Sequence, residues 1–276
     1  MKGVLTGTAI VSLALATVPA DAIAGPWTLP EGYLVTSYTY IQTDFDQFFD
    51  LDKNKLDLPG PIEQRDQLLS LTYGFWDEWE AALRLSYFMS DQRFPGNEVT
   101  ASGMGDTWLS IKHLVYSDML DVALQARVKW PGPYDADVVA SPGDGQDDLE
   151  FRILAGRFWD RAYVDLEVGY RFRAGVVPNE YEVFLDTGYS LTQWLRGRAF
   201  GILINAEDGT GSVNDPGVDL RATEEDVLSV GGSLTVDPAD GWTVTLGVTT
   251  VLAGRNTALR TDVGLTVAYT FDVLLP

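Results

Sequence analysis

The chain of 276 residues contains no cysteine and only one histidine, His113. The absence of cysteine excludes disulfide bridges, zinc-thiolate sites and iron–sulfur clusters. Basic residues are also scarce, since 19 Lys and Arg stand against 40 Asp and Glu and the formal net charge is −21. Nucleic acid binds to basic surfaces, so this balance argues against it as a partner.

Long apolar runs are missing except near the beginning of the sequence. Lys2 precedes the apolar stretch 4–18, and Ala22-Ile23-Ala24 places small residues where a signal peptidase reads them. We expect residues 1–24 to be a cleaved signal peptide and residues 25–276 to form one exported domain. No later segment has 18 consecutive apolar residues, which argues against a membrane-spanning helix. An exported chain without disulfides has to gain stability from its size or from burial in a membrane.

Apolar and polar residues alternate along most of the remaining sequence. In residues 161–174 one face is apolar throughout, with Ala162, Val164, Leu166, Val168, Tyr170 and Phe172. The same alternation predicts twelve strands, at residues 32–43, 66–73, 80–88, 106–115, 121–130, 148–156, 161–174, 180–189, 194–205, 226–236, 242–252 and 260–271. An even number of such segments is typical of an all-β fold, a transmembrane antiparallel up-and-down β-barrel.

The connections between the predicted strands alternate in length. Long loops are expected at 44–65, 89–105, 131–147 and 206–225, with shorter connections between them. This order is typical of a barrel in the bacterial outer membrane with both termini in the periplasm. Residues 25–31 are too few to fill the lumen, so we expect no plug ahead of the first strand.

Tryptophan placement supports the barrel, because aromatic rings gather where a membrane meets water. Five of the eight tryptophans lie at or beside the short turns, namely Trp76, Trp79, Trp159, Trp194 and Trp242. An opposite belt is expected from Trp108, Trp130, Phe172 and Tyr181. An exported soluble β-sandwich would also alternate, but it has no reason to gather tryptophans at one end.

Three glycine-containing stretches resemble a known family. They are Gly103-Met104-Gly105-Asp106 leading into Leu109-Ser110-Ile111-Lys112, then Pro142-Gly143-Asp144-Gly145-Gln146-Asp147, and Glu167-Val168-Gly169-Tyr170-Arg171. They are similar to the outer-membrane transporters grouped as the "meta-pathway of phenol degradation", and the likeness runs over most of residues 25–276. The resemblance implies a porin-like barrel that passes aromatic or other small organic compounds.

If the apolar faces meet lipid, the opposite faces line the lumen, and they carry many charges. The residues expected there as candidates for selectivity are Arg84, Arg127, Lys129, Arg152, Asp165, Glu167, Arg171, Arg173, Glu182, Asp186, Arg196 and Arg198. One interpretation is a constriction that favours anions, because rings of Arg and Lys select against cations. The other is a wall stiffened by ion pairs between neighbouring strands, since unpaired charges in a narrow lumen are costly.

A second wall is small and uncharged. Its hydroxyl and glycine positions are Ser229, Gly231, Ser233, Thr235, Thr243, Thr245, Gly247 and Thr249. Either these small residues leave a gap for a polar solute, or they merely suit a tightly curved wall.

Acidic residues gather in the expected long loops, and one run offers oxygen ligands for Ca²⁺. Asp144, Asp147 and Asp148 are the candidate metal ligands there, although their spacing is not that of an EF-hand loop. No other cofactor is indicated. Solvated acidic loops bridged to lipopolysaccharide by divalent ions are the alternative.

Catalysis finds little support in the sequence. His113 has the parity of Leu109 and Ile111, which places it on the lipid side near the periplasmic end. An outer-membrane lipase would need its imidazole at the outer mouth, beside Ser and a carboxylate or amide. The sequence therefore predicts a non-enzymatic channel or transporter that passes small organic solutes by passive diffusion, aromatic or carboxylate compounds being the class implied. A structural or adhesive surface barrel closed by ion pairs is the alternative, and a lipase-type enzyme is a minor one.

The expected partners follow from this location. They are a small-molecule solute, outer-membrane lipid and lipopolysaccharide. The last predicted strand alternates up to the near-terminal Phe271, which resembles the signal read by barrel-assembly machinery.

Overall fold

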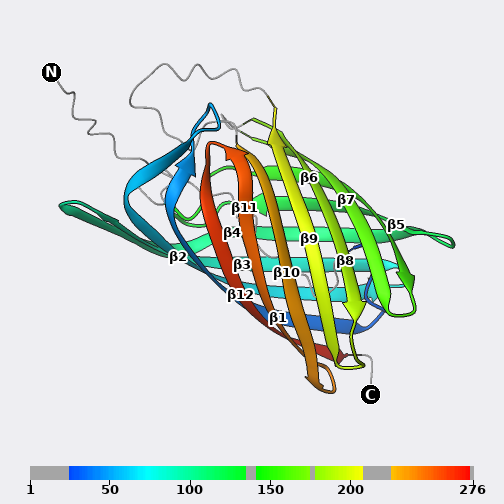
Figure 1. The fold of residues 1–276 in the computed structure, drawn as a ribbon. Helices are drawn as coiled ribbons and strands as arrows, with labels where there is room; N and C mark the ends of the chain where they lie inside the picture. Colours follow the sequence, from blue (N-terminus) through cyan, green and yellow to red (C-terminus); the bar gives the residue numbers. More distant parts are fainter. Residues whose placement is uncertain (1–24, 135–140, 175–177, 208–224, 274–276) are drawn as a thin grey trace.

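The computed structural model describes residues 25–134, 141–174, 178–207 and 225–273, and its regular elements there are all β-strands (Figure 1). None of the described residues forms a helix long and apolar enough to cross a membrane. Residues 1–24, the predicted signal peptide, lie outside the described residues.

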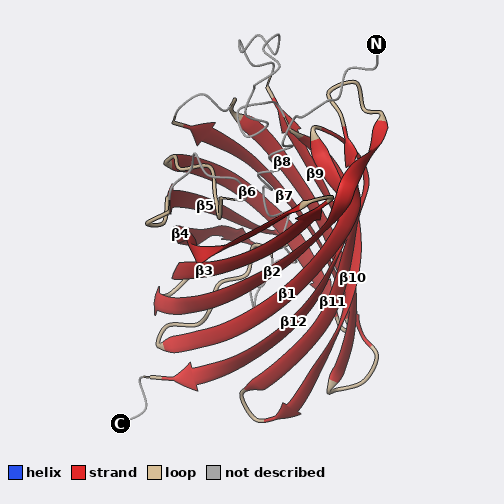
Figure 2. Ribbon diagram, turned by 90° about the vertical axis from the view of Figure 1, so that its left-hand side faces the viewer, coloured by secondary structure: helices blue, strands red, loops and turns tan. Residues whose placement is uncertain are grey.

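Twelve antiparallel strands close into a barrel, which confirms the predicted fold class. Each strand pairs with its neighbours in sequence, and the first pairs with the last. Figure 2 shows the strands inclined to the barrel axis, as closure of a sheet requires. Their bounds are β1 Tyr33–Phe49, β2 Lys55–Trp76, β3 Trp79–Phe94, β4 Asn97–Ser117, β5 Asp121–Trp130, β6 Asp148–Trp159, β7 Ala162–Arg173, β8 Glu180–Ser190, β9 Leu195–Ala206, β10 Asp226–Ala239, β11 Trp242–Arg255 and β12 Thr257–Asp272.

The alternating sequence explains the two surfaces of the wall. Leu166 and Val168 on β7 are exposed on the outside, whereas Asp165 and Glu167, which alternate with them, are buried inside the barrel. Successive side chains of a strand point to opposite faces, so every strand offers one apolar and one mainly polar row. The outer rows form the apolar band that a lipid bilayer requires.

Two of the predicted long loops are wrong, because they are continuations of strands. Residues 44–65 were expected to be a loop, but β1 continues to Phe49 and β2 begins at Lys55. Residues 89–105 likewise form a paired hairpin that turns at residues 95–96. Beyond the apolar band the outer faces of β1 and β2 are polar, whereas Phe45, Phe48 and Ile62 are buried on the inside. The hydrogen-bonded ladder therefore persists where the outer face is no longer apolar. Only the connections at 131–147 and 207–225 are long.

The two ends of the barrel can be told apart by their connections. At the end where β1 begins and β12 ends, here called the terminal end, five turns of two to four residues join the strands. The opposite end carries both long connections and is called the loop end. Trp76, Trp159, Trp194 and Trp242 are exposed at the terminal end, as the predicted aromatic belt requires.

Trp108 does not belong to the opposite belt, in contrast to Trp130, Phe172 and Tyr181, which are exposed. Its ring lies inside the barrel, with the guanidinium groups of Arg127 and Arg171 at 4.5 Å and 5.1 Å from the ring centroid. On β4 it shares the parity of the inward-facing Lys112, and the two arginines supply cation–π contacts there.

Residues 25–32, here called the N-terminal segment, cross the lumen, although residues 25–31 are too few to fill it and no plug was expected from them. The backbone amide of Leu29 donates to Glu80 on β3 at 3.0 Å, and the Trp27 indole donates to Asp121 on β5 at 2.8 Å. The amide of Gly25 donates to Glu167 on β7 at 3.2 Å. Since β7 is six strands from β1 in either direction, the segment reaches the far wall of the barrel.

The N-terminal segment is long enough to cross the lumen because an extended chain covers a long distance per residue. Seven extended residues span about 25 Å, and the barrel has only twelve strands. A few residues can therefore strap a lumen that they cannot fill.

Candidate functional site in the barrel lumen

The charged residues predicted to line the lumen lie on inward-facing positions of β3 and β5–β9. The structure sorts most of them into ion groups that run across neighbouring strands. Arg196 lies at the rim of the terminal end, where it pairs with Asp237 at 2.9 Å and is 47% exposed. Arg84 lines a cavity together with Arg127 and Arg152.

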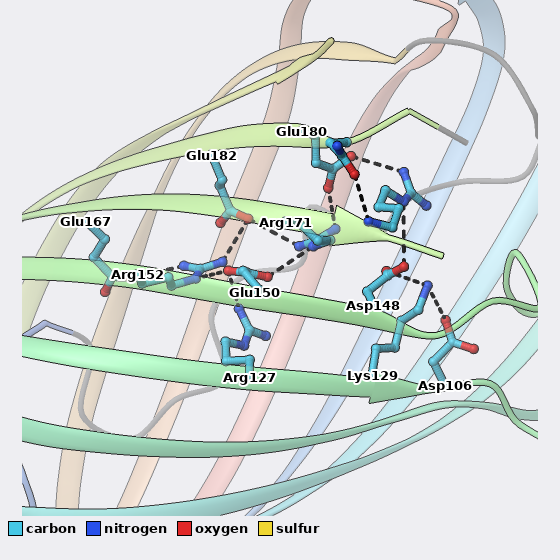
Figure 3. Close-up of polar contacts among 12 residues, drawn as sticks. Asp106, Arg127, Lys129, Asp148, Glu150, Arg152, Glu167, Arg171, Glu180 and Glu182 are labelled. Atoms are coloured by element: carbon cyan, nitrogen blue, oxygen red, sulfur yellow. Dashed lines mark hydrogen bonds and ion pairs between the residues drawn. The ribbon is translucent and has the colours of Figure 1, made fainter. Parts of the chain in front are cut away.

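The first of these groups, here called the central ion group, occupies the middle of β5–β8 (Figure 3). Arg152 lies at its centre and binds Glu167 at 2.9 Å and Glu182 at 2.8 Å, besides a short contact to Glu150. Glu150, only 1% exposed, also contacts other arginines. The six members are Arg127, Glu150, Arg152, Glu167, Arg171 and Glu182.

Adjacent strands dictate this arrangement. Register places Arg127 opposite Glu150 on β5 and β6, and Glu150 opposite Arg171 on β6 and β7. Cross-strand partners lie about 5 Å apart at Cβ, so opposite charges meet along a row across the wall. Such a lattice fixes the side chains and neutralises each carboxylate.

A second group, here called the loop-end ion group, lies nearer the loop end. Lys129 contacts Asp144 at 2.6 Å, Asp148 at 2.7 Å and Asp106 at 3.6 Å. Arg173 contacts Glu180 at 3.1 Å and also binds Asp144. The group comprises Asp106, Lys129, Asp144, Asp148, Arg173 and Glu180, so two cations face four carboxylates.

Tyr134 and Asp144, from the described parts of the β5–β6 connection, contact this group. Burial and the neighbouring Asp106 raise the pKa of the Tyr134 hydroxyl, which stays protonated and donates a hydrogen bond to Asp106. Burial also tends to raise the pKa of Asp144, but Lys129 and Arg173 outweigh it and hold this pKa below its usual value. Asp144 is therefore ionised at neutral pH and attaches its loop to the barrel wall.

These contacts bear on the predicted calcium ligands Asp144, Asp147 and Asp148. Asp144 and Asp148 already share Lys129 and Arg173 as counter-ions. In the ranges that the structure describes, no three acidic or histidine side chains are grouped so as to hold a metal ion. Calcium binding by this run stays a prediction, and an ion would have to compete with two basic side chains.

A third group joins β7, β8 and β9. Arg198 donates to Asp186 at 2.7 Å, and the Tyr163 hydroxyl donates to the same carboxylate at 3.0 Å. The Arg198 guanidinium also lies 5.1 Å from the ring centroid of Phe200 and 5.6 Å from that of Phe184. A cation and two aromatic rings thus meet on the inner face of the wall.

An apolar patch on the inner wall was missed by the sequence analysis. Its buried members, here called the apolar luminal cluster, are Phe49, Phe184, Phe200, Ile202, Ile204, Val227 and Val251. On β9 both faces are apolar from residue 199 to 204 except at Gly201, so a period of two shows no contrast. The run of apolar residues itself was the available signal, because a strand in contact with lipid on one side and a core on the other reads that way.

The small, uncharged wall on β10 and β11 adjoins this cluster at Gly231. Thr235 and Thr245 share a hydrogen bond of 2.9 Å, and Ser229 and Thr249 are buried. No gap is left beside Gly231, since a Cβ there would lie 2.4 Å from Cζ of Phe200. Glycine at this position gives room to an aromatic ring rather than to a solute.

A polar cavity lies beside the N-terminal segment. A cavity of about 50 Å³ is lined by Gly25, Leu29, Arg84, Trp108 and Lys112, among others. Since one water molecule takes roughly 30 Å³ in the liquid, this cavity has room for water beside the segment. The N-terminal segment therefore narrows the lumen at this level.

His113 lies where the sequence placed it, on the outer face near the terminal end. Its ring stacks on Trp79 with centroids 4.0 Å apart, and its Nδ1 lies 3.2 Å from the Glu78 carbonyl oxygen. These contacts account for both the ring and one of its nitrogens.

Comparison with known proteins bears on both the family and the fold. The family model described as "Putative MetA-pathway of phenol degradation" matches residues 65–267. A search of curated proteins gives no match. Among solved structures, an outer membrane channel from Pseudomonas putida F1 is similar with a TM-score of 0.76 at 13% identity, covering 90% of this chain and 99% of the other.

Two further structures share the architecture more loosely. The translocator domain of the autotransporter NalP from Neisseria meningitidis has a TM-score of 0.54 at 14% identity, with 88% and 90% of the two chains covered. The KdgM porin in complex with disordered oligogalacturonate has a TM-score of 0.51 at 9% identity, with 86% and 99% covered. The fold is thus that of outer-membrane β-barrels.

Proposed function

Because the chain belongs to the family named for the MetA pathway of phenol degradation, we propose that it is an outer-membrane channel for small organic solutes. Passage is passive diffusion through the lumen. The likeness to outer membrane channels and porins supports the proposal. The observation that carries it is the composition of the inner wall, which is apolar on β8–β11 and ion-paired on β5–β8.

The solute class follows from what each side of the lumen can bind. The apolar luminal cluster offers Phe184 and Phe200 to a ring, and Arg198 beside them offers a cation to a carboxylate. A lumen of ion pairs alone would favour small hydrophilic ions. Aromatic compounds and carboxylates, benzoate being the simplest that combines both, fit this wall best.

Proteoliposome swelling tests the proposal with two solutes of similar size, benzoate and the neutral sugar arabinose. We expect benzoate to enter several times faster than arabinose. Phe200→Ala should lower this ratio several-fold, because the wider lumen helps both solutes while the lost ring contact affects benzoate alone.

The matched control is Leu203→Ala on the same strand, whose side chain is exposed on the outer face. It should leave the ratio unchanged. Swelling with neither solute would contradict the channel. Equal rates in the original barrel would contradict the solute class.

One observation favours the alternative of a closed structural or adhesive barrel. The ion groups fix the wall of β5–β8, and the N-terminal segment leaves a cavity of only about 50 Å³ beside it. Liposomes that swell with neither benzoate nor arabinose would be the result expected of such a closed barrel.

The orientation belongs to the same proposal. We place the terminal end in the periplasm, where outer-membrane barrels have their short turns, and the loop end against lipopolysaccharide. Assembly would use the near-terminal Phe271, which is exposed on β12. Since the chain has no cysteine, Asp52→Cys and Asp160→Cys mark the two ends; an impermeant maleimide on intact cells should label only the first.

A further inference from the structure

A buried carboxylate on β7 lacks a partner among the described residues. Asp165 is 1% exposed, and neither of its carboxylate oxygens has a hydrogen-bond partner in the part of the chain that the structure describes. Its neighbours do not have this problem, since Glu167 pairs with Arg152 and Asp186 with Arg198. A buried carboxylate without a hydrogen-bond partner is costly, so this position favours an added donor with a positive charge.

Gly25, the first residue that the structure describes, lies next to the Asp165 carboxylate. The nitrogen of Gly25 lies 3.2 Å from Oε1 of Glu167, and a Cβ on Gly25 would lie only 3.1 Å from Cγ of Asp165. As a peptide amide this nitrogen carries one hydrogen and no charge. It can satisfy Glu167 or Asp165, but it cannot neutralise either.

Signal cleavage would change the chemistry of that nitrogen. The sequence predicts cleavage after Ala24. Hydrolysis of the Ala24–Gly25 peptide bond consumes one water, leaves a carboxylate on Ala24 and gives Gly25 a free amine. The amine takes up a proton at neutral pH, because its usual pKa is about 7.7–8.0. The product is an ammonium group with three N–H donors and a positive charge.

We propose that Asp165 and Glu167 form a binding site for the amino-terminal ammonium of Gly25 that signal cleavage creates. One ammonium supplies the missing partner of Asp165 and retains the contact to Glu167. The N-terminal segment, already held by Trp27 and Leu29, thereby gains a charged anchor in the processed protein.

Contacts with the barrel wall hold Gly25 and the two residues after it in place. Lys112 donates to the Gly25 carbonyl oxygen at 3.1 Å and pairs with Glu80 at 2.9 Å, which fixes the orientation of the residue. A Cβ on Gly156 would lie 2.9 Å from Cδ of Pro26, so glycine makes room for the proline ring. Trp27 packs on Phe158 with centroids 4.3 Å apart. The segment is therefore held at each residue next to the new terminus.

The test measures the amine itself in the mature protein purified from outer membranes in detergent. Intact mass should show a chain that begins at Gly25. Acetylation of its α-amine, followed by mass spectrometry at several pH values, should give a pKa at least one unit above the usual value. At pH 8 the amine should react at least tenfold more slowly than in the urea-unfolded protein. Asp165→Asn should restore most of that reactivity.

Two controls separate the ammonium site from a general loss of structure. Asp160→Asn changes an exposed carboxylate in the adjacent β6–β7 turn and should leave the amine slow. A serine inserted between Ala24 and Gly25 moves the ammonium by one residue while Asp165 stays intact, and it should give a fast amine. Heat-modifiable mobility in gels verifies that each variant is a folded barrel. A terminus other than Gly25, or equal amine reactivity in the original protein and Asp165→Asn, would overturn the proposal, whatever solute the barrel passes.

Discussion

Deletion of residues 26–31 is expected to raise the single-channel conductance of the barrel several-fold. These residues cross the lumen between β1 and β7 and fill the space next to a cavity of about 50 Å³. Their removal leaves Glu80, Lys112 and Asp121 facing water, which hydrates charged groups readily. The deletion keeps Gly25 joined to Gly32, so the predicted cleavage site is retained. Recording in planar bilayers at fixed salt measures the effect.

Substitution of one residue in the N-terminal segment should raise the conductance less than the deletion does. Trp27→Ala removes the indole that packs on Phe158 and Tyr163 and binds Asp121, and it should give an intermediate conductance with more frequent openings. Glu31→Ala is the matched control, because this side chain is exposed and makes none of these contacts. If the deletion leaves the conductance unchanged, the narrowest point of the lumen lies elsewhere, for instance at the ion groups.

Arg152→Met is expected to lower the free energy of unfolding by about 3–5 kcal/mol, the range for breaking a buried ion pair. The variant keeps an unbranched apolar stem in place of that of arginine but leaves Glu150, Glu167 and Glu182 without their shared cation. Glu150 retains Arg127 and Arg171, which places the loss within this range rather than above it. Urea unfolding in detergent micelles at neutral pH gives the measurement.

Arg196→Met is the control for this prediction. Arg196 forms an ion pair with Asp237, but both side chains are more than a third exposed at the rim. Exposed pairs contribute up to about 1 kcal/mol, so the loss should stay below this value. Losses of the same size for both variants would show that the interior of the barrel is as well hydrated as its rim and that the ion groups do not stabilise the wall.

The sequence by itself determined the number of strands, their order and the direction in which most side chains point. Each strand that crosses the apolar band has lipid on one side, so its residues alternate and the pattern can be read without a structure. Alternation also placed Arg152, Glu167 and Asp186 on the inner face and His113 on the outer one. Period-two patterns carry this information because a strand has only two faces.

The sequence failed where that contrast disappears. The hairpins of β1–β2 and β3–β4 continue beyond the apolar band, and their polar residues were interpreted as loops. On β9 the inner face is apolar as well, so Phe200 and Ile202 did not stand out as luminal. In both regions the hydrogen-bonded ladder is formed, but the pattern of an apolar outer face and a polar inner face is lost.

Only the tertiary structure decided which charges meet and what occupies the lumen. Arg127, Glu150 and Arg171 are 21 to 23 residues apart from one neighbour to the next, and the register of β5, β6 and β7 brings them into one row. The path of residues 25–32 depends on contacts with β3, β5 and β7, and no local pattern in the segment encodes them. Alternation is a local property of one strand. Ion pairing and obstruction of the lumen depend instead on distances across the closed barrel, and these distances are set only once all twelve strands are in place.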